Sequence, residues 1–420
     1  MQAKTIMILG GWALLGGALP AVAQDECEVP ECAGIAFNAN YAGDVRSNTS
    51  GGIKTGTAYS QLLTLGLDWS TDNLFSDARV TGSASVMYMG GDGISADYVG
   101  DLQGLNNIEA DTGWRLYEVW TEFAFGKANT TLRAGVLDLN AEFDAPETLG
   151  LFVAPPHGIG TEFSQTGSAG PSIWPLTGLG IRAAGEWENG FAWRFGIYDG
   201  APGSADGAAF SDLHVDSDEG ALLIGELAYS SERFNKISFG VWSYSAEFDR
   251  IDADLIANPT PESGNQGFYT LIDVSLGDIG DTAFDGALRF GSAEAKFNPV
   301  DNYIGAALTA SNFWPGRPDD ALGFAVAYAH MGDVYRATQA FNGAPATSAE
   351  VSYELVYSTN LSDWLAIKPG VQFVQHPGAD AALRNSWIVG LRFEVSRGKS
   401  WRLNAQREAH DGGTVASLEH

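Results

Sequence analysis

The chain has 420 residues, and its 52 acidic against 23 basic side chains give a formal net charge of −29. This surplus argues against nucleic acid or anionic lipid as a partner, because both carry the same sign of charge. It fits a path for cations or neutral solutes better than a path for anions.

The N-terminus has the pattern of a secretory signal peptide. Lys4 supplies a positive charge, Ile6–Leu19 is an apolar run, and Ala21-Val22-Ala23 fits a signal-peptidase site. We therefore expect residues 1–23 to be removed, with cleavage before Gln24, and exclude them from the fold. A membrane-anchoring helix is the alternative interpretation.

Residues 24–33 are expected to form a short periplasmic segment before the fold. They contain both cysteines of the chain, Cys27 and Cys32, and an exported protein meets an oxidising compartment. The short spacing favours a small disulfide loop, with two free thiols as the alternative. Two cysteines without a nearby histidine make a poor zinc site, so no metal is expected there.

The most informative pattern lies in residues 115–139, which predict two strands joined by a tight turn at Gly126–Asn129. On the first strand one face carries Tyr117, Val119, Thr121, Phe123 and Phe125, and the other carries Glu118, Trp120 and Glu122. On the second strand Leu132, Ala134 and Val136 share a face, and Arg133 points the opposite way. Successive strand side chains point to opposite sides, so the hairpin has one apolar and one charged face.

The same alternation recurs to the end of the chain, and no segment after residue 23 is long and apolar enough for a transmembrane helix. A membrane protein without such helices has to be a closed barrel. We therefore predict an all-β, antiparallel transmembrane barrel of about sixteen strands, within residues 34–397. The strands are expected near 34–41, 61–69, 79–89, 115–125, 130–138, 179–188, 191–199, 221–229, 236–244, 267–276, 284–294, 301–310, 322–331, 350–358, 364–374 and 386–395.

The predicted connectors alternate in length. Those after the second, fourth, sixth, eighth and fourteenth strands are short, and those after the first, third, fifth, seventh, ninth and thirteenth are long. Bacterial barrels have short periplasmic turns and long outer loops, so both chain ends are expected in the periplasm. Two connectors break the rule, because 295–300 is short for an outer loop and 311–321 is long for a turn.

The longest connector, about Asn140–Gly178, would be the third outer loop. It is rich in aromatic residues and prolines, including Phe143, Phe163 and Trp174, and should pack against something. A loop of this length in a compact domain is usually functional or disordered. We expect it to fold into the lumen.

Strand parity gives a set of charged lumen-facing residues beside this loop. Guanidinium and carboxylate groups offer donors and acceptors in fixed directions to sugar hydroxyls, and Trp120 could supply an apolar ring face. The candidate constriction residues are Glu118, Trp120, Glu122, Arg133, Asp138, Asn140, Glu142, Arg182, Glu186 and Arg194. Further lumen-facing candidates are Tyr198, Glu226, Asp273, Arg289, Glu354, Lys368, Gln372, Arg392 and Glu394. The plainer alternative is that these charged side chains only line a water-filled lumen and do not select a solute.

Other chemistries find less support. Residues 138–144 could offer oxygens to calcium, but they lack the glycine and the terminal glutamate of an EF-hand loop. No Gly-x-Ser-x-Gly or His-Glu-x-x-His motif appears, so catalysis is not expected. Carboxylate pairs such as Glu118 and Glu122 carry little weight in so acidic a chain.

Several segments resemble the carbohydrate-selective porins of the OprB type. They are DLQGLNNIEA, RLYEVWTEFAF, LRAGVLDLNAEFD, LGLFVAPPHGIG, WPLTGLGIRAA and FGIYDGAPGS, all within Asp101–Ser204, and the C-terminal YELVYSTNLSDWLAIKPGVQFVQHPG and WIVGLRFEV. The resemblance implies a sixteen-stranded outer-membrane barrel without a cofactor. It implies passive diffusion of sugars, notably glucose, through a constriction of inward loops, arginines, carboxylates and aromatic residues.

The C-terminus departs from this resemblance. Such barrels usually end with the last strand and a terminal aromatic residue, whereas here the last strand is expected to end near Val395, followed by a polar tail over 398–420. Leu418-Glu419-His420 looks like the remnant of an affinity tag. The alternative is a shifted last strand that includes SWRLNAQRE.

The sequence therefore predicts an outer-membrane porin for glucose-like sugars. Its partners would be small sugars and outer-membrane lipid, with no nucleic acid and with a homo-oligomer left open. A general small-solute or cation-preferring diffusion porin is the nearest alternative. An outer-membrane barrel enzyme and a secreted soluble β-protein are the alternatives from other classes.

Overall fold

The computed structural model describes residues 33–75, 78–125, 130–187, 189–203, 210, 213 and 219–402. The predicted signal peptide, the Cys27–Cys32 disulfide, nearly all of the segment 24–33 and the tail beyond 402 lie outside the described residues.

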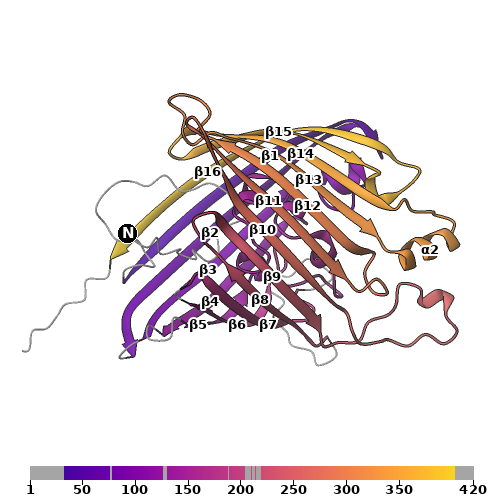
Figure 1. Cartoon of the computed structure of the whole chain (residues 1–420), viewed down its shortest axis with the longest axis horizontal. Coiled ribbons are helices and arrows are strands. Elements are labelled where there is room, and N and C mark those ends of the chain that lie inside the picture. Colours follow the sequence, from indigo (N-terminus) through magenta and orange to yellow (C-terminus); the bar gives the residue numbers. More distant parts are fainter. Residues whose placement is uncertain are drawn as a thin grey trace, which may run out of the picture.

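The described chain forms a closed antiparallel barrel in which each strand pairs with its neighbours in sequence and the first strand pairs with the last (Figure 1). The sixteen strands are β1 Gly34–Gly52, β2 Gly56–Phe75, β3 Ala78–Gly91, β4 Gly113–Phe125, β5 Thr130–Leu137, β6 Gly178–Glu186, β7 Phe191–Asp199, β8 Ala221–Tyr229, β9 Phe234–Tyr244, β10 Gln266–Ile279, β11 Thr282–Ala293, β12 Val300–Ser311, β13 Ala321–Met331, β14 Ala349–Ser362, β15 Leu365–Gln375 and β16 Arg384–Arg402. All sixteen predicted strands are confirmed.

Short helical turns lie in the connectors. They are η1 Ser95–Val99, η2 Leu139–Ala141, η3 Thr148–Leu151, η4 Pro155–His157, α1 Thr161–Ser164, η5 Ala253–Leu255, α2 Asp333–Phe341 and η6 Pro377–Ala379. Within the described ranges, no helix combines the length and the apolar character needed to cross a membrane.

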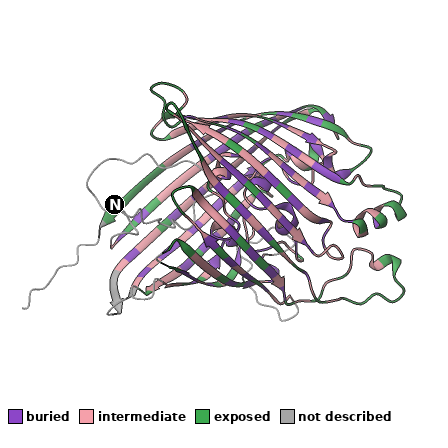
Figure 2. Ribbon diagram, in the orientation of Figure 1, coloured by how far each residue is buried: buried purple, intermediate pink, exposed green. Residues whose placement is uncertain are grey.

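The two faces of the barrel wall have opposite chemistry. Leu227 on β8 is 57% exposed, whereas its neighbour Glu226 is 2% exposed. Buried and exposed residues alternate in this way along most strands (Figure 2). Apolar side chains outside and polar ones inside are the arrangement of a barrel in lipid, because the lumen is the wet side.

Several strands are longer than predicted. The long connector expected after the first strand is wrong, because β1 and β2 are long and turn at 53–55. Its polar residues are strand residues instead, with Asp44, Arg46 and Asn48 buried on the inner face. An end near Val395 is also wrong, because β16 continues to Arg402 in register with β1. β1 and β16 extend beyond the residues with apolar alternation, because their backbone hydrogen bonds to each other continue there.

A β-bulge changes the orientation of one residue in β4. Ser85 pairs with Glu118 but Val86 pairs with Leu116, so Tyr117 is left over in the register. The extra residue turns Tyr117 inward, and its ring is buried. The predicted outward orientation of Tyr117 is therefore wrong, because parity does not survive a bulge.

The barrel has a long-loop end and a short-turn end. The long-loop end carries connectors such as 92–112, 138–177 and 332–348, and the short-turn end carries 280–281 and 363–364. Gly34 and Arg402 pair with each other at the short-turn end. The connector 312–320, long for this end, is held to β14 by Arg317, which pairs with Asp320 and contacts Thr359.

Candidate channel constriction

The connector 138–177 lies inside the barrel. It begins at β5, yet Glu354 on β14 accepts hydrogen bonds from the backbone N–H groups of Val153 and Ala154, each at 3.1 Å. The hydroxyl of Tyr303 on β12 donates to the carbonyl of Pro156 at 2.7 Å. These strands form the opposite wall, so the segment crosses the lumen.

Two arginines and two glutamates form a closed set of ion pairs at the start of this loop. Arg133 and Arg182 are register partners on β5 and β6. Arg133 contacts Glu122 at 3.1 Å and Glu142 at 2.8 Å. Arg182 contacts each of the same two carboxylates at 2.5 Å. We call these four residues the Arg–Glu square.

The square fixes the charge of Glu142, the one member supplied by the loop. Burial raises the pKa of this carboxyl, but Arg133 and Arg182 outweigh burial and lower it to about 2. The carboxylate is therefore ionised at neutral pH, as a bidentate guanidinium partner requires.

Trp120 does not offer the open ring face expected for sugar stacking. It is only 8% exposed, and the guanidinium carbon of Arg133 lies 3.8 Å from its ring centroid. The indole belongs to an apolar cluster with Leu137, Phe143 and Tyr198. The residue supports Arg133 from behind by a cation–π contact, so this part of the prediction is corrected.

Asp138, Glu118 and Asn140 lie close together, and their hydrogen bonds shape the start of the loop. The Asp138 carboxylate accepts from the Tyr117 hydroxyl at 2.5 Å and from the Asn140 N–H at 2.8 Å. Glu118 accepts from the Asp138 N–H at 3.2 Å. The Asn140 amide donates to three loop carbonyls. Burial raises the pKa of Asp138 to about 6.

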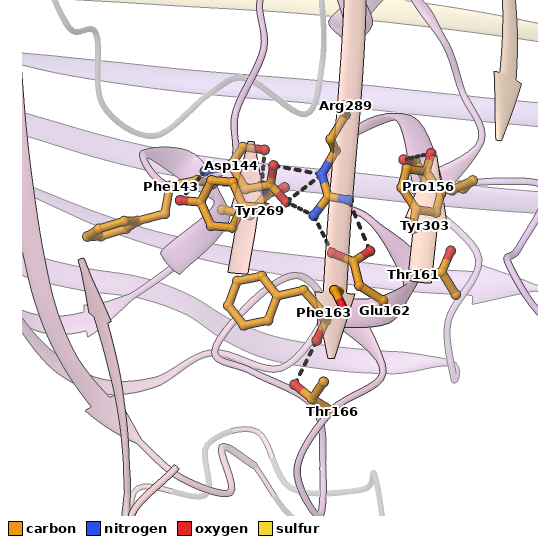
Figure 3. Close-up of polar contacts among 12 residues, drawn as sticks. Phe143, Asp144, Pro156, Thr161, Glu162, Phe163, Thr166, Tyr269, Arg289 and Tyr303 are labelled. Carbon is orange, nitrogen blue, oxygen red and sulfur yellow. Dashed lines mark hydrogen bonds and ion pairs between the residues drawn. The ribbon is translucent and has the colours of Figure 1, made fainter. Parts of the chain in front are cut away.

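A second ion-pair set holds the middle of the loop to the opposite wall (Figure 3). The Arg289 guanidinium on β11 lies between the carboxylates of Asp144, at 2.5–2.9 Å, and Glu162, at 2.8–3.0 Å. Tyr303 and Tyr269 lie with their ring centroids 5.0 and 5.7 Å from it. All three charged groups are buried, so the geometry depends on complete pairing.

Two glycines make this approach possible. A Cβ at Gly291 would lie 1.7 Å from the Glu162 carboxylate, and one at Gly160 would lie 1.7 Å from the Arg289 guanidinium. Any larger residue would push the ion pair apart.

Arg194 belongs to a neighbouring group of charges, whereas Glu186 joins no such group among the described residues. Glu226 on β8 contacts Arg194 at 3.0 Å and Lys236 at 2.9 Å, and it accepts from the Tyr269 hydroxyl at 2.8 Å. Glu186 is exposed at the short-turn end of β6, away from the loop, so its predicted place in the constriction is wrong. Strand parity gives the face of a residue but not its height in the barrel.

The connector 92–112 also enters the lumen, which the sequence interpretation missed. Arg392 on β16 donates to Asn106 at 2.6 Å and to Asn107 at 2.7 Å, and it pairs with Asp44 at 2.9 Å. Glu350 on β14 accepts from the N–H groups of Leu102 and Gln103 at 2.7 and 3.0 Å. The amide residues Gln103, Asn106 and Asn107, which alternate with apolar residues in the stretch 102–108, were the available signal.

The structure separates the oxygens once considered for calcium. Asp138 faces Tyr117, Glu142 faces the two arginines of the square, and Asp144 faces Arg289. Among the residues that the structure describes, no group of His, Cys, Asp or Glu is arranged to hold a metal ion. The inner face of the barrel therefore carries paired charges and contacts two anchored connectors, 92–112 and 138–177.

Comparison with known proteins places this architecture in a family. The model of the carbohydrate-selective porin OprB family matches residues 54–396. Porin B of Pseudomonas aeruginosa is 22% identical over 404 residues, covering 86% of this chain and 87% of the relative. The putative porin QuiX of Acinetobacter baylyi is 21% identical, covering 86% and 89%.

Solved structures agree in fold. The high-pH structure of Pseudomonas putida OprB matches with a TM-score of 0.75 at 18% identity, covering 87% of this chain and 94% of that one. An anion-selective porin from Comamonas acidovorans matches with a TM-score of 0.51 at 12% identity, covering 86% and 99%. The chain belongs to the carbohydrate-selective porins of the OprB family, outer-membrane β-barrels for the passive diffusion of sugars.

Proposed function

We propose that glucose-like sugars cross this channel between the two lumen loops, past the Arg–Glu square. The observation that carries this proposal is that Arg133 and Arg182 are each held by two carboxylates at the base of the loop 138–177. Fixed guanidinium and carboxylate groups suit sugar hydroxyls, which donate and accept hydrogen bonds. Weak contacts of this kind favour entry without trapping the solute.

We assign solute contact to the charged groups that keep some exposure. The side chains of Glu122 and Lys236 are 15% and 14% exposed, and that of Arg194 is 9% exposed. Arg289, Asp144 and Glu162 are almost fully buried and would set the width of the passage.

The short-turn end is proposed to face the periplasm, because short turns are periplasmic in bacterial barrels. The long loops would then meet the medium. A homo-oligomer stays a prediction, tested by native mass spectrometry of the protein extracted in mild detergent.

A cation-preferring diffusion channel is the second candidate. The net charge of −29 favours it, although the charge inside the lumen decides ion selectivity and not the total. Sugar block separates the two candidates, because a diffusion channel without a sugar site conducts equally with and without sugar.

The test is single-channel conductance in planar bilayers, titrated with glucose and with maltose-series sugars. Saturable block by sugar supports the proposed path, and the half-blocking concentrations rank the solutes. Conductance that is blind to sugar contradicts the sugar site and leaves the diffusion channel. The glutamate variants Glu122→Gln and Glu186→Gln form a matched pair, since both remove one carboxylate but only Glu122 lies in the square.

A further inference from the structure

The last strand extends beyond its neighbour at the short-turn end. The pairing of β15 with β16 ends at Leu365 and Val395, and the Ser396 N–H donates to the Trp364 carbonyl at 3.1 Å. The pairing of β16 with β1 continues to Arg402 and Gly34. In Figure 1 the tip of β16 accordingly projects past the adjoining turn. Among the described residues, the strand beyond Ser396 has a partner on one edge only.

The outer face of this projecting strand changes from apolar to basic. Trp387, Val389 and Leu391 are exposed on the outer face of β16. The same alternation places Arg397 and Lys399 on that face, where their register partners on β1 are Ala39 and Phe37. Basic residues at the end of an apolar lipid-facing row lie at the level of lipid headgroups.

Both cations of this row lie over aromatic rings of the described chain. The Arg397 guanidinium carbon lies 5.3 Å from the ring centroid of Trp364, and the Lys399 ammonium lies 5.2 Å from that of Trp401. Within the described ranges neither has an acidic partner within salt-bridge distance, whereas the cations of the Arg–Glu square are fully paired. Both residues are exposed.

The stretch at the end of β16 has the opposite charge to the chain as a whole. Residues 397–402 hold three of the 23 basic residues and no acidic one. Across an aqueous surface, charges more than about 10 Å away are largely screened at 0.1 M salt, so the local sign governs what binds. The net charge of the whole chain therefore does not decide whether this stretch attracts an anionic group.

We propose that Arg397 and Lys399, with the indoles of Trp364 and Trp401, bind the headgroup of an anionic phospholipid in the leaflet at the short-turn end. Guanidinium and ammonium groups suit a phosphate oxygen, and tryptophan prefers the membrane interface. Phe393 and Val395, the apolar residues that precede Arg397 on the same face of β16, give the acyl chains a surface to follow. Whether this leaflet is the periplasmic one depends on the orientation proposed above, but the lipid site itself does not.

Native mass spectrometry of the full chain, supplied with phosphatidylglycerol or phosphatidylethanolamine of equal acyl chains, tests this site. The native protein is expected to retain phosphatidylglycerol preferentially. Each basic residue near an anionic surface adds roughly fivefold in affinity, so Arg397→Gln with Lys399→Gln should weaken phosphatidylglycerol binding about 25-fold. Phosphatidylethanolamine binding should stay unchanged.

Arg233→Gln is the matched control, because Arg233 also stacks on an aromatic ring, that of Phe234, near the short-turn end but on another strand pair. It should leave the lipid preference intact. Equal retention of both lipids by the native protein, or an undiminished preference in the double variant, overturns the proposal. A double variant that keeps its lipid preference but loses self-association would show that the surface binds a second copy of the chain instead.

The double variant also separates this site from the transport path. Arg397 and Lys399 lie outside the lumen, so sugar block of the conductance should be that of the native protein. If the well-folded native protein itself shows no sugar block, the transport proposal is contradicted, but the proposal of a lipid site is not.

Discussion

Arg289 and Asp144 are 145 residues apart in sequence, yet their side chains meet at 2.5 Å inside the barrel. Arg289 belongs to the barrel wall and Asp144 to the loop that crosses the lumen. Their contact therefore holds this loop to the wall opposite the strand from which the loop starts.

Replacing Arg289 by methionine should widen or destabilise the passage. The change leaves Asp144 and Glu162 buried without a cation, which costs about 3–5 kcal/mol when one partner of a buried pair is removed. The loop is then expected to leave the wall, and single-channel conductance should rise or become noisy. A variant with native conductance and native thermal stability would show that the pair does not hold the loop.

Glu354→Gln should loosen the same loop at a second point. The carboxylate accepts from two successive backbone N–H groups, and an amide provides one acceptor oxygen for them. Liposome swelling with sugars of increasing size should show a larger size limit. Glu186→Gln is the control, as it removes an exposed carboxylate at the other end, and its size limit should equal the native one.

Glu122→Gln should reduce cation preference. Its carboxylate is the most exposed member of the Arg–Glu square, and without it the two arginines retain one carboxylate between them. Reversal potentials in a salt gradient are expected to shift toward anions. An unchanged reversal potential in this variant, which still contains Glu142, would mean that the charge of the Arg–Glu square does not influence the permeating ions.

Acid should weaken the square through Glu142. The folded pKa of this loop carboxyl lies at about 2, below the usual value of 4.5, so its stabilisation is complete above about pH 4.5 and is lost as pH falls toward 2. The difference corresponds to roughly 3 kcal/mol. Denaturant unfolding at pH 6 and pH 3 should show a smaller loss of stability in Glu142→Gln than in the native chain, and equal losses would contradict this origin.

Trp120→Phe should leave sugar block almost unchanged. The indole is buried behind Arg133 and is not open to solute, and a phenyl ring retains part of the cation–π support. Titration of conductance with glucose measures this. A half-blocking concentration raised tenfold would restore the stacking role that the sequence suggested.

The strand pattern of this barrel can be predicted from sequence because lipid and water impose a period of two on every strand. That period correctly placed Arg133, Arg182 and Arg289 on the inner wall. It failed at Tyr117, where a bulge shifts the face, and at Asp44, where polar residues continue a strand without apolar alternation.

The candidate site was harder to predict than the wall. Parity says which side chains face inward, but the partner of each is set by loops that cross the lumen. Arg392 was assigned to the lumen, yet its contacts with Asn106 and Asn107 depend on the path of the connector 92–112. Such long-range pairing leaves no periodic signal in the sequence.

The seam between β1 and β16 has a consequence for assembly. Its hydrogen-bonded register runs from Gly34 with Arg402 to Gly52 with Arg384, so it joins the two ends of the described chain. Until the final strand arrives, β1 presents an open edge that any other strand could capture. Closure also joins the residues most distant in sequence, the slowest kind of contact to form. We therefore expect the free edge of β1 to need shielding until β16 pairs with it.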